Sequence, residues 1–267
     1  MPEEESTEAP RLHAKLFPSE PIIGGPFLNA FHKVLKATLP EWTSRLTVRE
    51  GGVDRCVVGP DDDLAAAIPI VPRISPRGRQ GAHLYGAYRG LSFLLISSPD
   101  SLPPSHNVIN ICSDGRPEIE GRSTHEWIRT FFEAVVAAIP IRYGLACDGE
   151  EFSAQNSIAD EWSVELVGRD MTKSLPGLYW LNYFGEPYVD FIGETRLTTA
   201  PGPIVRKVDH GVFIELAESP WDWRSPAYQS LREDVLSHLG PEYFYSLQNP
   251  DRPTIAPTFT RSQSALP

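Results

Sequence analysis

The chain has 267 residues and a net charge of −11, with 35 acidic side chains against 24 basic ones. Hydrophobic residues make up 41% and charged residues 22%, the composition of a soluble globular protein that buries a core without metal or disulfide. The acidic surplus opposes binding to nucleic acid, and no apolar run approaches the roughly 20 residues of a membrane helix, so neither is an expected partner.

The ends of the chain differ from its middle in composition. The first residues, MPEEESTEAP, are acidic and lack the basic and apolar regions of a secretory signal. The cysteines are odd in number and too far apart for a C-x-x-C pair, which is typical of reduced thiols. We therefore expect a cytoplasmic protein with a disordered acidic segment over 1–20, a single domain over 21–252 and a flexible tail over 253–267.

The first predicted elements follow a segment rich in proline and glycine. Residues 10–26 contain several such breaks and predict an extended lead-in. Apolar side chains at helical spacing then predict a helix over 27–39, ended by Pro40. Strands are predicted next from short apolar and β-branched runs, over 46–49, 53–58, 91–97 and 108–112.

The clearest helix is predicted over 124–139. Ser123 and Glu126 form an S-x-x-E capping box, one face carries a continuous apolar stripe, and Pro140 ends the helix. The capping box gives Glu126 a structural role, although it stands beside His125.

Two more strands are predicted between this helix and the aromatic part of the chain. The first covers 142–147. In the second, over 162–167, Trp162, Val164 and Leu166 alternate along the chain as expected for a half-buried strand.

The stretch GLYWLNYFGEPYVDFIGETRL, residues 177–197, is the richest in aromatic side chains. As a strand, residues 178–183 place large side chains on both faces, which is typical of a central strand buried under helices. Pro187 then starts a short helix that ends at Gly193. We interpret the stretch as core in preference to a binding surface.

The last predicted elements are a hairpin and a helix. Strands over 204–208 and 212–217 flank a short link that contains Gly211, which predicts an antiparallel hairpin. A helix opens at Ser225-Pro226 and closes at Gly240-Pro241. Because helices and strands do not alternate strictly, we expect a single compact α+β domain with a largely antiparallel, mixed sheet covered by helices on one face.

Motifs for catalysis and cofactor binding are absent from the sequence. It contains no phosphate-binding glycine loop, no HExxH, no C-x-x-C pair and no nucleophile elbow, and its histidines are dispersed. The adjacent carboxylates Asp61, Asp62 and Asp63 are typical of a solvated turn. We therefore expect no catalytic residue, no metal and no cofactor, and a protein that is not an enzyme.

Acidic side chains gather in one segment, because residues 143–168 contain six acids and no lysine or arginine. Such a field repels phosphate backbones and attracts basic proteins. Trp221 and Trp223 lie in a loop and are candidate aromatic anchors, with a lid over the core as the alternative. The acidic candidates for contact with a partner are Asp148, Glu150, Glu151, Asp160, Glu161 and Glu165.

A family resemblance lies in three stretches of the second half. GLYWLNYFGEPYVDFIG, HGVFIELAESPWDW and HLGPEYFYSLQNPDRPTIAP resemble the C-terminal pattern of immunity protein family 52 of bacterial polymorphic-toxin systems. The match covers about residues 107–258. It implies a non-enzymatic antidote that binds one cognate toxin, often a nuclease, and it carries over no catalytic or contact residue.

Composition and resemblance favour the same function. We expect an immunity protein that neutralises a cognate toxin, with a nuclease effector as the favoured target, by steric and electrostatic blocking. Two alternatives stay open: a hydrolase that uses scattered carboxylates, and an adaptor that binds another cellular protein. A cleft with converging carboxylates would favour the hydrolase.

Overall fold

A ten-stranded sheet forms the centre of the molecule, in the order β13-β14-β12-β9-β1-β6-β5-β4-β2-β3. Every neighbouring pair is antiparallel. The computed structural model describes residues 11–19, 22, 25–39, 46–50, 53–58, 82–88, 90–97, 107–119, 121–159, 163–202 and 204–259. The strands of the sheet are β1 (Leu12–Pro18), β2 (Leu46–Glu50), β3 (Val53–Val58), β4 (Ala82–Tyr88), β5 (Leu91–Ser97), β6 (Val108–Ser113), β9 (Ile141–Asp148), β12 (Leu181–Gly185), β13 (Ile204–Val208) and β14 (Gly211–Glu215).

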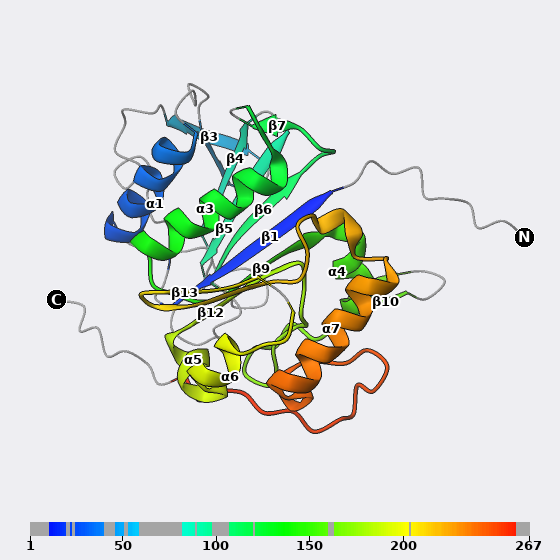
Figure 1. The fold of residues 1–267 in the computed structure, drawn as a ribbon. Coiled ribbons are helices and arrows are strands. Elements are labelled where there is room, and N and C mark those ends of the chain that lie inside the picture. The colour runs from blue at the N-terminus through cyan, green and yellow to red at the C-terminus, as the bar shows by residue number, and fades with distance from the viewer. Residues whose placement is uncertain are drawn as a thin grey trace, which may run out of the picture.

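Helices cover both faces of this sheet (Figure 1). Two short two-stranded sheets lie outside it, β7 (Glu118–Ile119) with β8 (Arg122–Ser123), and β10 (Ser157–Ala159) with β11 (Val164–Leu166). The helices are α1 (Gly25–Thr38), α3 (Thr124–Ala138), α4 (Gly149–Asn156), α5 (Glu186–Ile192), α6 (Glu194–Thr198), α7 (Pro226–Leu239) and the 3₁₀ turns η2 (Pro220–Asp222) and η3 (Pro241–Tyr243). The α+β fold with a largely antiparallel sheet is thus confirmed.

Alternating side chains on the strands build a separate core on each face. On β9, Tyr143 and Leu145 enter the core under α4, α5, α6 and α7, whereas Ala146 enters the core under α1 and α3. Trp127 links α3 to the end of α1, because its indole N–H donates a hydrogen bond to the carbonyl of Thr38 at 2.9 Å. The expectation that helices cover one face is therefore wrong, since β9 is apolar on both faces and needs two covers.

The chain begins its regular structure earlier than the sequence predicts. β1 pairs with β6 on one side and β9 on the other, and Leu12, Ala14 and Leu16 are buried on one of its faces. The predicted disordered segment over 1–20 is therefore wrong for residues 12–18, and residues 1–10 lie outside the described part. The prolines of this region suggest irregular structure, but Pro18 merely ends the strand.

The end of the chain is also attached to the fold. Ile255 donates its backbone N–H to the carbonyl of Glu242 at 3.0 Å. The ring centres of Phe259 and Tyr188 lie 6.0 Å apart, and the Arg142 guanidinium lies 4.7 Å from the ring centre of Phe259. Residues 253–259 thus have no regular secondary structure but pack on the domain, which places the predicted tail boundary at 253 too early.

The aromatic stretch is core, as predicted. Tyr179, Trp180, Tyr183 and Phe184 are all buried. The predicted strand over 178–183 is shifted, because Asn182 takes both backbone groups of Tyr179: its Oδ1 accepts the N–H at 3.1 Å and its Nδ2 donates to the carbonyl at 2.6 Å. Regular pairing therefore starts only at residue 181.

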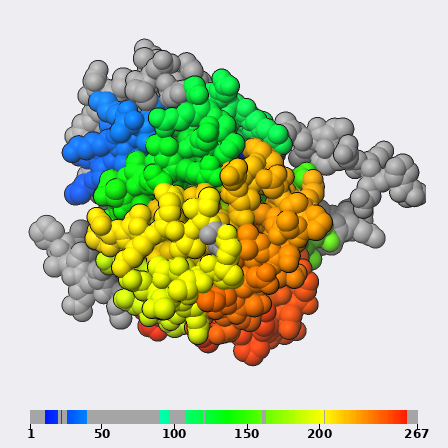
Figure 2. Space-filling view, viewed as in Figure 1, coloured from blue at the N-terminus to red at the C-terminus, as the bar shows by residue number. Residues whose placement is uncertain are grey.

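A charged network fixes the predicted hairpin of β13 and β14 to helix α3. Glu215 is buried and accepts hydrogen bonds from Arg129 Nε at 2.7 Å and Arg206 Nη2 at 2.8 Å. Arg206 also pairs with the exposed Glu133 of α3. Figure 2 shows the yellow surface of this hairpin directly against the green surface of α3.

We expect Glu215→Gln to destabilise the protein by about 2 kcal/mol, because it leaves two guanidinium groups without their buried counter-ion while both remain partly hydrated. Glu133→Gln removes an exposed partner of the same network and should cost under about 1 kcal/mol. Urea unfolding of the two variants measures the difference. Equal losses would contradict a central role for Glu215.

Candidate protein-binding surface

The acidic segment folds into a helix followed by a small hairpin at one edge of the molecule. β9 ends at Asp148, α4 follows, and β10 pairs with β11 to form the hairpin 157–166. Figure 1 shows α4 and β10 side by side next to α7. The four acids of this segment that the structure describes, Asp148, Glu150, Glu151 and Glu165, thus lie on three different elements.

Asn156 anchors the base of this hairpin. Its side chain is buried, and Nδ2 donates to the carbonyls of Val167 at 3.2 Å and Pro176 at 2.8 Å. Its Oδ1 accepts the hydroxyl of Tyr179, and its carbonyl accepts the N–H of Val167 at 2.8 Å. One buried amide therefore joins the hairpin to the aromatic core.

Two of the predicted contact residues have structural roles inside the fold. Asp148 is the N-cap of α4, where its Oδ1 accepts the N–H of Glu150 at 2.8 Å. Burial raises the pKa of Asp148, and the hydrogen bond from Glu150 opposes this shift. Its low exposure corrects the prediction that it presents charge to a partner.

Glu151 is the second correction, because its side chain is 0% exposed. It accepts hydrogen bonds from the hydroxyl of Tyr228 at 2.6 Å and from Gln155 Nε2 at 3.3 Å. Burial raises the pKa of Glu151 to about 8, against the opposing effects of Tyr228 and Arg232. This carboxyl therefore joins α4 to α7 and is largely protonated at neutral pH.

Glu150 reaches the surface but is already paired. Its carboxylate accepts a hydrogen bond from Arg224, whose guanidinium lies 4.7 Å from the ring centre of Trp223. An arginine from the loop after η2 thus neutralises the first turn of α4. No local sequence pattern pairs Arg224 with Glu150, because the two are 74 residues apart along the chain.

The two tryptophans of the loop each pack against a different core. Trp221 packs against the core under α3 and carries the Arg116 guanidinium 4.4 Å from its ring centre. Trp223 packs against the core under α7. Both rings are half-buried, so the lid alternative describes their packing, and their part in binding stays a prediction.

Exposed apolar side chains mark the hairpin itself. Val164 is 68% exposed, Ile158 48% and Leu166 38%. Ala159 lies opposite Val164 in the register, so these residues and Leu166 share one face, while Ile158 and Glu165 share the other. The strand predicted over 162–167 is confirmed at Val164–Leu166, but its predicted half-burial is wrong, because both sides of this short hairpin meet solvent.

Glu165 is exposed on the hairpin, as its proposed contact role requires. Asp160, Glu161 and Trp162 belong to the sequence between β10 and β11 and lie outside the described residues. The sequence signal for the hairpin was available: two short apolar runs flank the acidic pair at 160 and 161.

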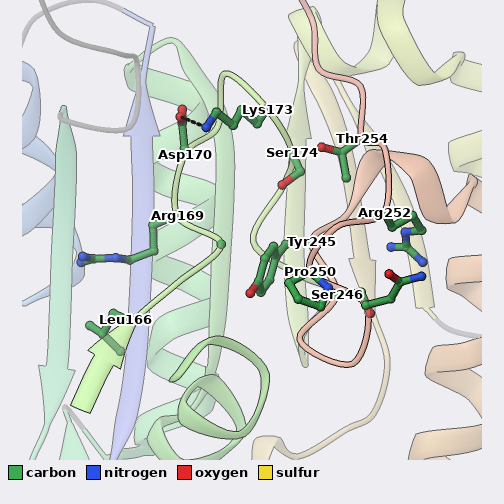
Figure 3. Close-up of a pocket in the computed structure, with 12 residues that line it drawn as sticks. Leu166, Arg169, Asp170, Lys173, Ser174, Tyr245, Ser246, Pro250, Arg252 and Thr254 are labelled. Atoms are coloured by element: carbon green, nitrogen blue, oxygen red, sulfur yellow. Dashed lines mark ion pairs between the residues drawn. The ribbon is translucent and has the colours of Figure 1, made fainter. Parts of the chain in front are cut away.

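A pocket of about 410 Å³ lies next to the base of the hairpin (Figure 3). Leu166 and the loop that follows β11 form one wall, and residues 245–254 form the other. Its lining contains a single carboxylate, Asp170, and neither histidine nor cysteine. The titratable Glu151 does not line it, so the converging carboxylates expected of a hydrolase are not found at this pocket.

Groups with nucleophilic or ligand chemistry also meet on the central strands. His13 on β1 lies between Cys147 on β9 and Cys112 on β6 in the register. Burial, Lys15 and Arg11 lower the pKa of His13 to about 4, and burial raises the pKa of both thiols. The thiols are thus protonated at neutral pH and poor nucleophiles. Within the described ranges, no group of three or more such side chains could hold a metal ion.

No family model and no curated protein matches the chain. A solved structure that matches it is the T6SS protein PA0821 of Pseudomonas aeruginosa, with 9% identity, a TM-score of 0.49, and coverage of 87% of this chain and 74% of that chain. The resemblance to immunity protein family 52 stays a prediction.

None of the helices in the described part of the chain has the length and apolar character needed to cross a bilayer.

We expect Glu151→Gln to change the pH dependence of stability. A carboxyl with a pKa of about 8 in the folded state and an ordinary value of 4.5 contributes full stability below about pH 4.5 and loses it as the pH rises toward 8. The neutral amide has no such loss. The variant should therefore gain on the wild type by up to about 1.4 kcal/mol per pH unit between pH 5 and 8.

Urea unfolding at pH 5 and pH 8 tests this expectation, with Glu150→Gln as the control on the partly exposed neighbour. The control should show less than about 1 kcal/mol of change between the two pH values. A difference between Glu151→Gln and wild type that is the same at both pH values would contradict a raised pKa.

Proposed function

We propose that this protein is a non-enzymatic, immunity-type inhibitor that binds a toxin protein in the cytoplasm and blocks it by occupancy. The observation that carries the proposal is the hairpin 157–166. Among the described residues, it holds three of the five large hydrophobic side chains that are exposed. Exposed apolar side chains concentrated on one short element are typical of a protein interface.

Charge on the hairpin supports the same function. Glu165 is exposed between Val164 and Leu166, and the sequence adds Asp160 and Glu161 between the two strands. A nuclease toxin has a basic groove for its substrate, and an acidic apolar hairpin complements such a groove. The proposed contact is thus smaller than the sequence predicts, because Asp148, Glu150 and Glu151 are buried or paired.

Anchoring of the hairpin also fits binding by occupancy. Asn156 joins it to the buried aromatic stretch, so its apolar face is held in place before a partner arrives. Pre-ordering lowers the entropy lost on association. Inhibition of this kind needs no chemical step.

Co-expression with the product of the adjacent gene tests the proposal. Rescue of growth from a toxic product, together with co-purification, is the expected result. Co-purification with a harmless protein would favour the adaptor. Turnover of a small molecule by the purified protein would favour a hydrolase, and either outcome would overturn the proposal.

We expect the double substitution Ile158→Ser and Val164→Ser to weaken binding of the captured partner at least about tenfold, because one apolar contact is lost on each face of the hairpin, and the proposed groove of the partner receives both faces. Folding stability should change by less than about 0.5 kcal/mol, since both side chains are exposed. Calorimetry of the complex measures the affinity.

The matched control is Ile204→Ser with Ile255→Ser. These side chains are 47% and 48% exposed, close to the 48% of Ile158, but belong to β13 and the C-terminal segment. Binding should be unchanged. Equal weakening by both pairs would show that general surface hydrophobicity matters and the hairpin does not.

Charge reversal of Glu165 should act mainly on the association rate. Glu165→Lys is expected to slow association by about three- to tenfold at low salt and to flatten its dependence on salt, because steering toward a basic partner is reduced. Glu118→Lys, an exposed acid on β7, is the control. Stopped-flow measurement of an unchanged rate for Glu165→Lys would place the contact elsewhere.

A further inference from the structure

The pocket beside the hairpin has walls that are fixed to one another. Leu175 and Tyr245 join the two segments, since the N–H of Leu175 donates to the carbonyl of Tyr243 and the N–H of Tyr245 donates to that of Leu175, each at 2.8 Å. Gly168, at a φ of +67°, lies so close that a Cβ there would be 2.3 Å from the Tyr245 ring. The pocket is therefore already formed without a ligand.

Its charge is opposite in sign to that of the chain. Three basic side chains, Arg169, Lys173 and Arg252, line it against the single acid Asp170. The Nζ of Lys173 lies 3.8 Å from Oδ2 of Asp170, and Figure 3 shows this ion pair at the side of the pocket. On the same loop, the side chain of Arg169 extends away from Tyr245. Because Arg169 extends away and Lys173 pairs with Asp170, Arg252 leaves one net positive charge at the pocket, and in a protein with a net charge of −11 this favours an anionic ligand.

Arg252 lines the pocket from the opposite wall, formed by residues 245–254. Its Nη2 donates to the carbonyls of Pro241 and Phe244, each at 2.8 Å, and this holds the C-terminal segment in place. Its Nε is buried and has no hydrogen-bond partner among the described residues. The guanidinium is thus only partly satisfied by the protein itself.

Neutral side chains give the pocket a second character. Hydroxyl groups of Ser174, Ser246 and Thr254 and the amide of Asn249 can pair with polar groups of a ligand, while Leu166 supplies an apolar wall. Leu166 shares the exposed face of the hairpin with Val164. The apolar strip of the hairpin is thus continuous with the basic pocket.

We propose that this pocket binds a short acidic segment of a partner protein, in which an aspartate or glutamate enters the pocket and the adjoining apolar side chain packs on Leu166 and Val164. A volume of about 410 Å³ is within the range of ligand pockets and can hold two or three side chains of a bound peptide. A peptide supplies both the carboxylate and the apolar group, whereas an inorganic anion supplies only the charge.

This inference goes beyond the proposed function, because the pocket would serve a partner of any biological role. Its failure and that of the inhibitor proposal are distinguishable: peptide binding needs no toxin, and neutralisation of a toxin needs no peptide in this pocket.

The test uses the full-length protein labelled with ¹⁵N and three blocked dipeptides, followed by NMR titration. Acetyl-Leu-Asp-amide should shift the resonances of residues 166–174 and 245–254. Acetyl-Leu-Asn-amide, which lacks the charge, should bind about tenfold more weakly, and acetyl-Gly-Asp-amide, which lacks the apolar group, several-fold more weakly.

Lys173→Gln should weaken binding of the acidic dipeptide about fivefold, because a charge-assisted contact is lost. Lys33→Gln is the matched control, since Lys33 is also an exposed lysine but lies on α1, which covers the other face of the sheet. The control should bind as the wild type does.

Three results would overturn the inference. The acidic and neutral dipeptides could bind equally, the shifts could fall outside the two pocket segments, or inorganic phosphate at the same concentration could shift the same residues as strongly. The last result would identify a site for simple anions and not for a peptide.

Discussion

The pairing of β1 with β6 and β9 is the interaction on which the rest of the structure depends. Strands β2 to β6 lie on one side of β1, and β9, β12, β13 and β14 lie on the other, so this strand alone joins two groups into one sheet. Its Leu12, Ala14 and Leu16 enter the core under α1 and α3, and its opposite face carries Lys15, whose amine lies 3.7 Å from the ring centre of Phe152 on α4. β1 therefore positions α4, and α4 leads directly into the hairpin at the proposed binding surface.

Much of the fold follows from local sequence signals. The capping box of Ser123 and Glu126 and the apolar stripe predict α3, and short apolar and β-branched runs predict β5, β6 and β9 within one or two residues. The sequence does not reveal β1, because Pro10 and Pro18, which flank it, resemble loop residues, and because its partners β6 and β9 are more than about 90 residues away in the sequence. Local patterns cannot report a strand whose stability comes from distant neighbours.

The candidate site was less predictable, because charge along the chain does not show which acids reach solvent. The acids at 148, 150 and 151 lie within four residues, yet one caps α4, one pairs with Arg224 and one is buried against Tyr228. Each role depends on a partner from another element. The acidic surplus of residues 143–168 thus contributes less to the outer surface than its sequence suggests, and the exposed apolar residues of the hairpin become the stronger signal for binding.

Hydrogen–deuterium exchange of the protein, alone and in complex with the captured adjacent-gene product, tests the central claim most directly. Binding by occupancy at the hairpin predicts slower exchange on complex formation at residues 157–166, with α1 and α3 on the opposite side of the sheet unchanged. Protection confined to α1 and α3, or none anywhere in a protein that still neutralises the toxic product, would contradict it.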